Sequence, residues 1–294
     1  MDRDGRWKQS LCCPECFGEL ILSDRSFTCR ECKSCFAQTA SGIPILMRPE
    51  DRRAIEATLA RDEAADMKAE YERRSESRGF TKAIRKLYPP EPVYVNPEAP
   101  PLPGPRGELS LWLGGAGLHL PGFVNVDLVP ATGVDLLANV ARLPFQADSC
   151  DFIACPALLE HVPDPAQVVS EMHRVLKPGG EVDAVVPFCH PYHAYPADYS
   201  RFSREGLEKL FSGYRDVCIG IRTGPTTTVL TFLTYYSKLI FPVHGGNQIR
   251  RGFNRLVAGA LGWAMYPFKY LDKWINRLPQ ASVLANHFYV EAKK

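Results

Sequence analysis

The stretch from residue 108 to residue 188 alternates short apolar runs with segments of mixed polarity. Apolar runs at 109–113 (LSLWL), 123–127 (FVNVD) and 151–155 (DFIAC) predict buried strands. A helix is predicted after the third run, ending at Lys177-Pro178-Gly179-Gly180, and another apolar strand follows directly. This alternation predicts a doubly wound, mostly parallel α/β sheet, in which ligands bind at the carboxyl ends of the strands.

The pattern changes after residue 202. Residues 203–211 (SREGLEKLF) read as a helix with Ser203 as its N-cap, and residues 216–222 and 286–292 read as strands. The residues between these two strands are too many for a simple connection, so we predict an insertion at 223–285.

This insertion is apolar, aromatic and basic at 229–243 and 254–278. On a helical wheel of 261–278, the apolar arc consists of Leu261, Ala264, Phe268, Leu271, Ile275 and Leu278. The arc is flanked by the aromatic residues Trp263, Tyr270 and Trp274, and the basic residues beyond them are Lys269, Lys273 and Arg277. This order is typical of a helix in a membrane interface, and Pro267 is expected to open or kink it. The alternatives are a helix that packs on the sheet or an acceptor pocket, and one that binds a protein or RNA.

The remaining chain divides by composition. We predict a cysteine-rich ribbon at 1–49, a charged helical connector at 50–88, a proline-rich linker at 89–106, a core at 107–222 and a final core strand at 286–294, with the insertion between the last two. Residues 89–105 hold eight prolines, which prevent both strand pairing and a continuous helix.

Charge is distributed unevenly over the 294 residues. The chain carries a net charge of +2, but residues 225–294 hold nine Lys or Arg and only Asp272 and Glu291 as acids, a net of +7. A basic C-terminal part predicts contact with an anionic surface, either lipid or nucleic acid.

The N-terminus has no apolar secretory core. The sequence contains no window of about 18 uncharged apolar residues, so no membrane-spanning helix is predicted. We therefore expect a cytoplasmic protein, with peripheral attachment to the inner face of the membrane through 229–278.

Six of the ten cysteines fall within residues 12–35, which favours a metal site over disulfides in a cytoplasmic protein. Cys13-x-x-Cys16 and Cys29-x-x-Cys32 have the spacing of two zinc knuckles, and four thiolates make a closed, structural Zn²⁺ site. Cys12 and Cys35 lie near enough to compete, and reduced thiols packed as small hydrophobic residues are the alternative. The segment resembles the small zinc-ribbon family whose free-standing members activate methyltransferases, through Cys13-Pro14-x-Cys16, Gly18-x-Leu20, Cys29-x-x-Cys32, Phe36 and 42–46 (GIPIL). Lys33 stands where that family usually has glycine.

A glycine turn, with Gly114, Gly115 and Gly117, follows the first core strand, and Asp127 ends the second. Glycines let the backbone approach a nucleoside closely, and an acid at this strand end can accept hydrogen bonds from both ribose hydroxyls. Together these features predict a nucleoside-binding site.

Over about residues 108–215 the chain resembles the class I S-adenosylmethionine-dependent methyltransferases of the type 11 branch. The matching motifs are 113–117 (LGGAG), 125–127 (NVD), 143–145 (LPF), Ser149-x-Asp151-Phe152, 159–162 (LEHV) and 174–180 (RVLKPGG). The resemblance implies S-adenosyl-L-methionine as cofactor and a seven-stranded sheet whose final strand is antiparallel and lies beside the sixth.

The resemblance also implies roles for single residues. The glycine turn would hold the methionine end of the cofactor, Asp127 the ribose, and Asn139 and Val140 the adenine, while Cys155 would line the methyl-donor pocket. The chain departs from the family at Ala116, at Trp112 and at Asn139, where aspartate is usual, and its first helix is shortened.

Residues 188–202 (FCHPYHAYPADYSRF) follow the fifth strand, where the methyl acceptor is expected. Histidine titrates near neutral pH and suits a general base. We predict His193 as the base, His190 as the second candidate and Asp198 as the residue that orients it. A loop held by its own aromatic packing is the alternative, and a His190-x-x-His193 metal site lacks an evident third ligand.

These features predict an S-adenosylmethionine-dependent methyltransferase that acts on oxygen in a small, membrane-associated acceptor: a lipid, quinone or lipid-linked sugar. An RNA methyltransferase is one alternative, but the basic residues are interleaved with apolar runs and no separate RNA-binding motif is visible. A catalytically inactive, methyltransferase-like adaptor is the other.

Overall fold

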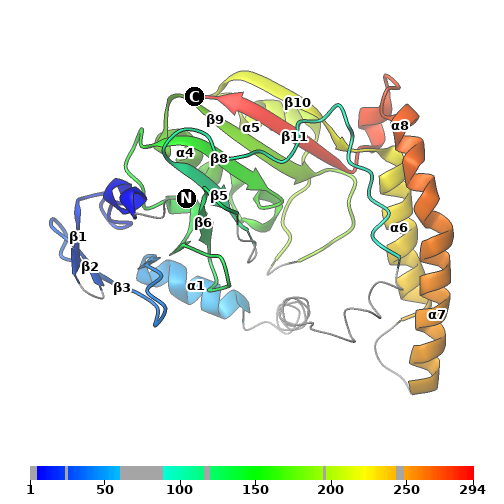
Figure 1. The fold of residues 1–294 in the computed structure, drawn as a ribbon, viewed down its shortest axis with the longest axis horizontal. Coiled ribbons are helices and arrows are strands. Elements are labelled where there is room, and N and C mark those ends of the chain that lie inside the picture. Colours follow the sequence, from blue (N-terminus) through cyan, green and yellow to red (C-terminus); the bar gives the residue numbers. More distant parts are fainter. Residues whose placement is uncertain (1–4, 24–25, 60–88, 116–119, 195–196, 243–247) are drawn as a thin grey trace.

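The computed structural model describes residues 5–23, 26–59, 89–115, 120–194, 197–242 and 248–294. Predictions for most of the helical connector (60–88) and for Ala116 and Gly117 lie outside the described residues. Figure 1 shows a central sheet with the N-terminal segment at one end and a helical pair at the other.

The central sheet has eight strands in the order β10-β11-β9-β8-β5-β6-β7-β4. Their bounds are β4 (Ile45–Leu46), β5 (Ser110–Leu113), β6 (Val124–Asp127), β7 (Leu136–Ala138), β8 (Cys150–Pro156), β9 (Leu176–Pro187), β10 (Arg215–Thr223) and β11 (His287–Lys293). The strands from β4 to β9 pair in parallel, whereas β11 pairs antiparallel with both β9 and β10. The predicted doubly wound sheet and its antiparallel last strand are confirmed, and β4 is an eighth strand that the prediction did not include.

The strands have two apolar faces, as their near-continuous apolar runs require. In β8, Ile153 and Cys155 belong to the main core, whereas Phe152 and Ala154 belong to a smaller cluster with Trp112 on the opposite face. Side chains alternate because successive residues of a strand point to opposite faces.

Two helices contribute apolar side chains to the main core. Helix α4 (Pro165–Val175) begins at Asp164, whose side chain accepts from Gln167 N, and α5 (Arg204–Leu210) begins at Ser203, which accepts from Gly206 N. The predicted end of α4 at residues 177–180 is wrong, because Leu176 already pairs with Cys150 as the first residue of β9.

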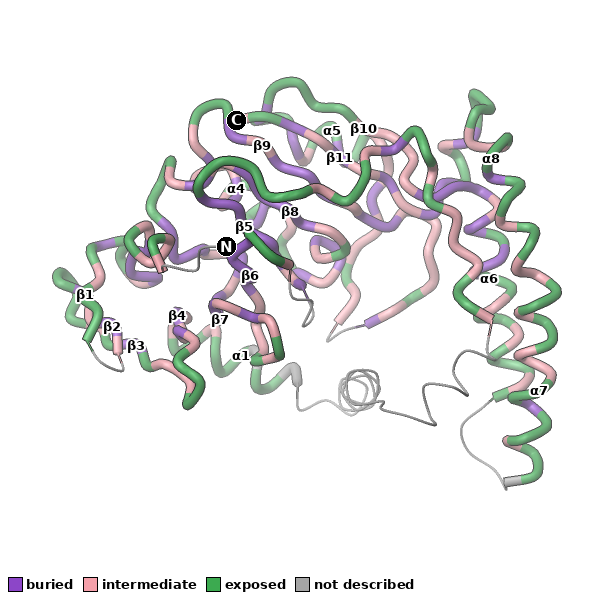
Figure 2. Tube along the Cα trace, viewed as in Figure 1, coloured by how far each residue is buried: buried purple, intermediate pink, exposed green. Residues whose placement is uncertain are grey.

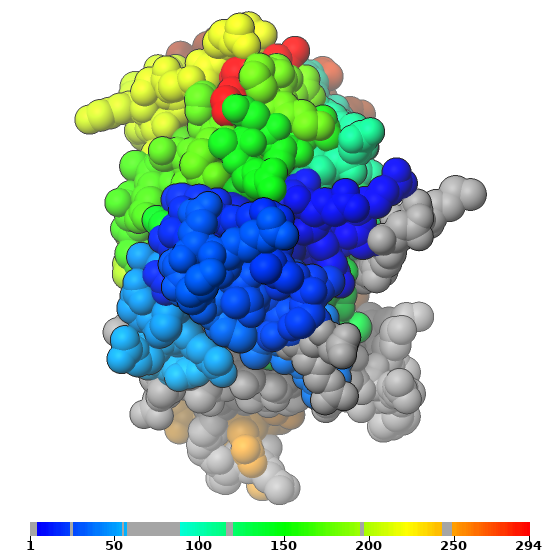
Figure 3. Space-filling model, turned by 90° about the vertical axis from the view of Figure 1, so that its left-hand side faces the viewer, coloured from blue at the N-terminus to red at the C-terminus, as the bar shows by residue number. Residues whose placement is uncertain are grey.

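The N-terminal segment forms a small antiparallel sheet of β1 (Leu20–Ser23), β2 (Ser26–Cys29) and β3 (Cys35–Ala37), preceded by a 3-10 helix, η1 (Arg6–Ser10). Figure 3 shows this segment, in blue, packed against the core, in green. Cys12 N donates to Pro144 O at 3.0 Å, and the guanidinium groups of Arg142 and Arg174 lie 4.2 and 4.5 Å from the Phe17 ring centre. The segment is thus docked on its own chain, and β4 extends the sheet beside β7.

Helix α1 (Pro49–Leu59) follows β4 and is the described part of the predicted connector. The proline-rich residues run along the open side of β10, where Asn96 N donates to Arg222 O at 2.9 Å and Asn96 Nδ2 to Ile221 O at 3.1 Å. Figure 1 shows this segment leading toward α6.

The insertion forms α6 (Pro225–Ile240), α7 (Gln248–Met265), η4 (Tyr266–Leu271), α8 (Asp272–Ile275) and η5 (Ala281–Leu284). The wheel's single helix over 261–278 is therefore divided, with a 3-10 turn where Pro267 interrupts the backbone hydrogen bonds. The fully buried Asp272 accepts from Thr226 N and Thr227 N at 2.7 and 2.8 Å and so caps α6. Within the described part of the chain, we find no helix with the length and apolarity needed to cross a bilayer.

Candidate functional site

A pocket of about 490 Å³ lies at the carboxyl ends of the central strands, where the α/β sheet predicts a ligand. Its lining includes Gly114 after β5, Asp127 at the end of β6, Asn139 and Val140 after β7, and Leu158 after β8. Its volume falls in the ordinary range of small-molecule and cofactor sites.

Gly114 has two features that favour glycine at this position. Its φ is +71°, a conformation that other residues rarely adopt, and a Cβ would lie 2.9 Å from Leu158 Cδ1. The turn therefore brings bare backbone to the pocket wall. Gly115 is buried and does not line the pocket, while Gly117 lies outside the described residues.

Asp127 ends β6 with its carboxylate fixed by the following backbone. Its Oδ1 accepts from Leu128 N at 2.7 Å and from Val129 N at 3.4 Å. This anchoring sets the carboxylate at the strand end, where it lines the pocket.

Asn139 caps the 3-10 helix η2 (Val140–Arg142), with Oδ1 accepting from Ala141 N at 2.9 Å. Its Nδ2 donates to Asp51 Oδ1 at 2.9 Å, and Arg48 Nε donates to Asp51 Oδ2 at 2.8 Å. Arg48 and Asp51 also line the pocket. The N-terminal part of the chain thus supplies a carboxylate to this pocket, which sequence reasoning missed because no local pattern marks it.

Cys155 is fully buried in the main core and does not line the pocket. Ala157 and Leu158, two and three residues later, line it instead. Ala157 has a φ of +51°, which turns the chain at the end of β8.

A second, apolar groove of about 580 Å³ lies between the segment after β9 and helix α6. Phe188, Cys189 and His190 line one side, and Thr228, Val229, Phe232, Leu233 and Leu284 line the other. Val229 and Phe232 are each 49% exposed, so the groove opens onto the exposed face of α6.

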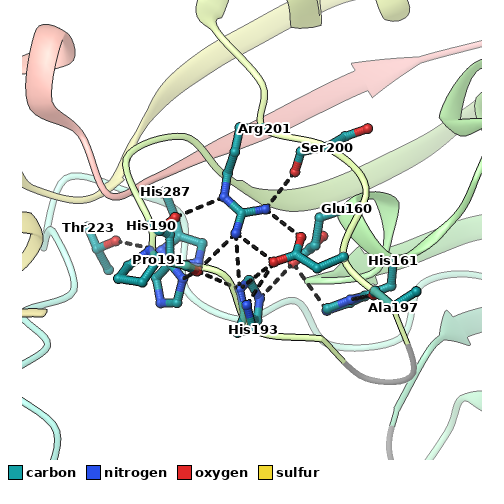
Figure 4. Close-up of polar contacts among 11 residues, drawn as sticks. Glu160, His161, His190, Pro191, His193, Ala197, Ser200, Arg201, Thr223 and His287 are labelled. Atoms are coloured by element: carbon teal, nitrogen blue, oxygen red, sulfur yellow. Dashed lines mark hydrogen bonds and ion pairs between the residues drawn. The ribbon is translucent and has the colours of Figure 1, made fainter. Parts of the chain in front are cut away.

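Three histidines lie between the two cavities, and Figure 4 shows His193 between His190 and His161. His161 lines the first pocket and His190 lines the groove. The His193 ring lies between them, with its centre 5.1 Å from that of His161 and 4.4 Å from that of His190. Tyr195, beside them in sequence, lies outside the described residues.

Asp198 and Arg201 hold this segment in place. Arg201 forms a bidentate pair with Asp198, with N–O distances of 2.5 and 2.7 Å, and donates from Nε to His190 O. Asp198 also accepts from His193 N at 2.8 Å. Burial acts to raise the pKa of Asp198, but Arg201 and His193 outweigh it and lower the pKa to about 2.

His193, the predicted general base, and His190, the second candidate, have different surroundings. Burial acts to lower the pKa of His193, but contacts with Glu160 and Asp198 raise it overall, and its Nε2 lies 3.6 Å from Glu160 Oε1. His193 lines neither cavity. Burial lowers the pKa of His190, and its Nδ1 lies 2.7 Å from Pro191 O. His190 is therefore the histidine in contact with the groove.

The four predicted zinc ligands come together. The Sγ atoms of Cys13 and Cys32 lie 3.6 Å apart, those of Cys16 and Cys29 lie 3.4 Å apart, and all four lie within 4.8 Å of one another. Thiolates bonded tetrahedrally to zinc at about 2.3 Å lie roughly 3.8 Å apart, so the cluster fits this ion. Cys12 is buried outside the cluster, where burial raises its pKa to about 12, and Cys35 is also outside it.

Comparison with known proteins agrees with this geometry. Residues 124–182 match the family model described as a methyltransferase domain. Over 68 residues the chain is 38% identical to a ubiquinone biosynthesis O-methyltransferase of Saccharophagus degradans, covering 23% of this chain and 26% of the relative. Over 54 residues it is 44% identical to a demethylmenaquinone methyltransferase of Lysinibacillus sphaericus, covering 18% and 23%.

Each of these matches spans about a quarter of the relative's length. A phosphoethanolamine N-methyltransferase 2 of Haemonchus contortus superposes with a TM-score of 0.39 and 16% identity, over 65% of this chain and 50% of that one. A likeness of this size does not bear on the reaction. The residues that match the methyltransferase-domain model include β6, β7, β8 and the start of β9, so the similarity includes strands that border the pocket.

Proposed function

We propose that this chain transfers a methyl group from S-adenosylmethionine to an oxygen atom of an apolar, membrane-associated acceptor. The observation that carries this proposal is the adjacency of the two cavities, joined by His161, His193 and His190. The sulfonium of the cofactor supplies an activated methyl group. The protein has to align it with the acceptor oxygen and remove the proton of that oxygen.

The residues of the first pocket fit the cofactor. In this proposal Gly114 gives backbone access, Asp127 binds the ribose hydroxyls, and Asn139 and Val140 lie at the adenine end. Asp51, joined to Asn139, supplies the carboxylate that Asn139 itself lacks. Asn139 Oδ1 can still accept a hydrogen bond, although it already caps η2.

The groove selects an apolar acceptor. Its lining is almost entirely apolar apart from His190 and Thr228. The two relatives described above are named for quinones, which favours a quinol over a lipid or a lipid-linked sugar. We assign His190 as the group that takes the acceptor's proton, because it lines this groove, whereas His193 faces Glu160.

The exposed face of α6 and α7 supports delivery of the acceptor from a membrane. Large apolar side chains are exposed there, among them Leu239 (79%), Ile249 (85%) and Leu256 (72%). Figure 2 shows α7 and the second half of α6 as largely exposed or intermediate, whereas the first half of α6 is mostly buried. Residues 225–294 carry a net charge of +7, which favours an anionic lipid surface.

We further propose that Cys13, Cys16, Cys29 and Cys32 bind one structural Zn²⁺. Glu15 N and Glu31 N each lie 3.4 Å from the sulfur of the cysteine two residues earlier, an arrangement that stabilises thiolates. A site closed by four sulfurs leaves no open position for chemistry.

The test is transfer of radiolabelled methyl groups from S-adenosylmethionine by the full-length, zinc-loaded protein. Membrane lipid extract, a soluble quinol and total RNA are offered separately. We expect label in the organic phase and in the quinol, and a His190→Gln variant slower by about 10²–10⁴-fold, with His173→Gln on α4 as the matched control. Label found only in RNA, or no transfer to any acceptor, would refute the proposal.

A further inference from the structure

Glu160 is a buried carboxylate whose hydrogen-bonding capacity is not used. It lies in the 3-10 helix η3 (Leu159–His161) and is 0% exposed. Neither of its oxygens accepts a hydrogen bond from any residue that the structure describes. Burying an ionised carboxylate is costly unless it is paired or coordinates a metal, so this position calls for a partner.

Two imidazoles face this carboxylate with the same ring nitrogen (Figure 4). His161 Nε2 lies 3.8 Å and His193 Nε2 lies 3.6 Å from Glu160 Oε1. Both separations are too long for a hydrogen bond and too short for a water molecule placed between the atoms. Ligands bonded to a metal at about 2.1 Å with tetrahedral geometry lie roughly 3.4 Å apart, so a small cation fits among the three groups.

The other ring nitrogen of each histidine is already held. His161 Nδ1 lies 2.6 Å from Ala197 O, and His193 Nδ1 lies 3.2 Å from Pro191 O and 3.5 Å from Asp198 Oδ2. The carbonyl acceptors lie closest to Nδ1, since the donor Arg201 Nη2 is 3.5 Å from His193 Nδ1, and they place the proton on Nδ1 and leave Nε2 with a lone pair toward Glu160. This is the outer-shell pattern that orients metal-binding histidines.

The ligand set also points to a kind of cation. The three ligand atoms lie within 4.8 Å of one another. Two imidazoles and one carboxylate suit Mn²⁺, Fe²⁺ or Zn²⁺ better than Mg²⁺ or Ca²⁺, which prefer oxygen ligands. Three protein ligands leave a coordination position open, as in catalytic rather than structural sites.

We propose that Glu160, His161 and His193 bind one divalent transition-metal cation between the cofactor pocket and the apolar groove, and that its open position takes the acceptor's oxygen. The binding of the cation stands on the ligand geometry alone, and only the role of its open position rests on the proposed function. The His190-x-x-His193 pattern lacked a third ligand. The proposed site uses Glu160, His161 and His193 instead, because η3 brings Glu160 and His161 beside His193.

The test uses full-length protein already loaded with zinc at the cysteine cluster. Mn²⁺ is titrated by electron paramagnetic resonance, because thiolates select zinc while this site suits manganese. We expect one Mn²⁺ bound per chain and affinity at least ten-fold weaker in Glu160→Gln and in His193→Gln. His173→Gln, on the surface of α4, serves as the matched histidine control and should bind as the wild type does.

Zinc content gives a second readout. After excess Zn²⁺ and desalting, we expect two zinc ions per wild-type chain and one per Glu160→Gln chain, with melting temperatures confirming that each variant folds. One zinc per chain in the wild type together with no bound Mn²⁺, or Mn²⁺ binding equal in all variants, would overturn the proposal. Titration of the same samples with S-adenosylhomocysteine separates this proposal from the proposed function. If the protein binds the cofactor product but no second cation, the metal site is refuted and the proposed function still stands.

Discussion

At the scale of single residues, Asn139 acts through a partner 88 positions away. Asp51 accepts from its Nδ2 at 2.9 Å and is itself held by Arg48. The Asp51 side chain is only 11% exposed, so this polar group is largely removed from water and oriented toward the pocket. In the proposed cofactor site, Asp51 on helix α1 thus supplies the carboxylate that Asn139 lacks.

Asp51→Ala should weaken the binding of S-adenosylhomocysteine about ten-fold, because Asn139 loses its partner and the adenine end loses its carboxylate. Isothermal titration calorimetry measures this affinity. Glu50→Ala is the matched control, since Glu50 pairs with the same Arg48 at 3.1 Å from an exposed position. Equal affinities in the two variants would contradict the role given to Asp51.

Asp183 in β9 is a buried acidic residue that lies beside a second acidic residue. It is 7% exposed and lies opposite Glu291 in the neighbouring strand β11. Burial, followed by the negative charge of Glu291, raises its pKa to about 6, against about 3.9 in an unfolded chain. The folded state therefore binds this proton more tightly than the unfolded state does.

The free energy of unfolding should consequently fall as the pH rises from about 4 to 6, where Asp183 ionises in the folded protein. Asp183→Asn should raise it by roughly 3 kcal/mol at pH 7.5, and this gain should vanish near pH 4. Urea denaturation at both pH values checks the prediction, with the exposed Asp216→Asn as control. A gain that is the same at both pH values would show that charge is not the cause.

Single residues with local chemistry could be predicted from the sequence, and those that act at a distance could not. The four cluster cysteines are identified by spacing alone. Lys33 stands where the zinc-ribbon family usually has glycine, and its φ of +63° is a conformation that glycine adopts more readily. Asp51 has no such signal, because its partner is fixed only by tertiary packing. The sequence places Glu160 next to His161, but it does not predict that Glu160 is buried or that it lies close to His193.

At the scale of elements, α6 and α7 differ from the other helices in what they expose. Helix α4 buries its apolar residues Val168, Val169 and Met172, whereas α6 and α7 leave Leu239 and Leu256 more than two thirds exposed. Apolar side chains left in water in such numbers mark an interaction surface.

Leu239→Asp combined with Leu256→Asp should reduce partition onto anionic phospholipid vesicles at least ten-fold, because each leucine loses roughly 1.5–3 kcal/mol of burial in the bilayer interface. Vesicle co-sedimentation measures the bound fraction. Leu102→Asp, 61% exposed in the proline-rich segment, is the matched control. Unchanged partition of the double variant would exclude these helices as the membrane contact.

Six core strands (β5, β6, β8, β9, β10 and β11) and the Ser203 cap of α5 followed from the sequence because their signals are local, whereas the three-residue strand β7 and the Asp164 cap of α4 were not predicted. The amphipathic wheel over 261–278 identified the exposed aromatic residues but not the break at Tyr266–Leu271, where a 3-10 turn replaces the helix. Strand β4 has only two residues, and its pairing with β7 is a long-range contact that periodicity does not reveal.

At the scale of the whole molecule, the cysteine-rich segment is connected to the cofactor pocket. The chain passes from the cluster through β4, which pairs with β7, to Arg48 and then into α1, which carries Asp51; both residues line the pocket. The sequence left open whether this segment binds its own core or another protein. Its contacts with Pro144, Arg142 and Arg174 place it on its own core.

Loss of the Zn²⁺ proposed to bind at the cysteine cluster should therefore destabilise the core as well as the ribbon. We expect Cys29→Ser to lower the melting temperature of the main transition by several degrees, because the edge of β7 loses its covering strand. Differential scanning calorimetry tests this, with the exposed Cys35→Ser, outside the cluster, as control. A main transition that is unchanged in Cys29→Ser would mean that ribbon and core are energetically independent.

Calorimetric titration with S-adenosylhomocysteine tests most directly whether the pocket at the strand ends binds S-adenosylmethionine. Asp127→Ala removes the ribose-binding carboxylate at the end of β6, a position exposed to the pocket, so folding should be retained. We predict micromolar binding by the wild type and at least a hundred-fold weaker binding by Asp127→Ala. No binding by folded, zinc-loaded wild-type protein, or equal binding by both, would contradict this account.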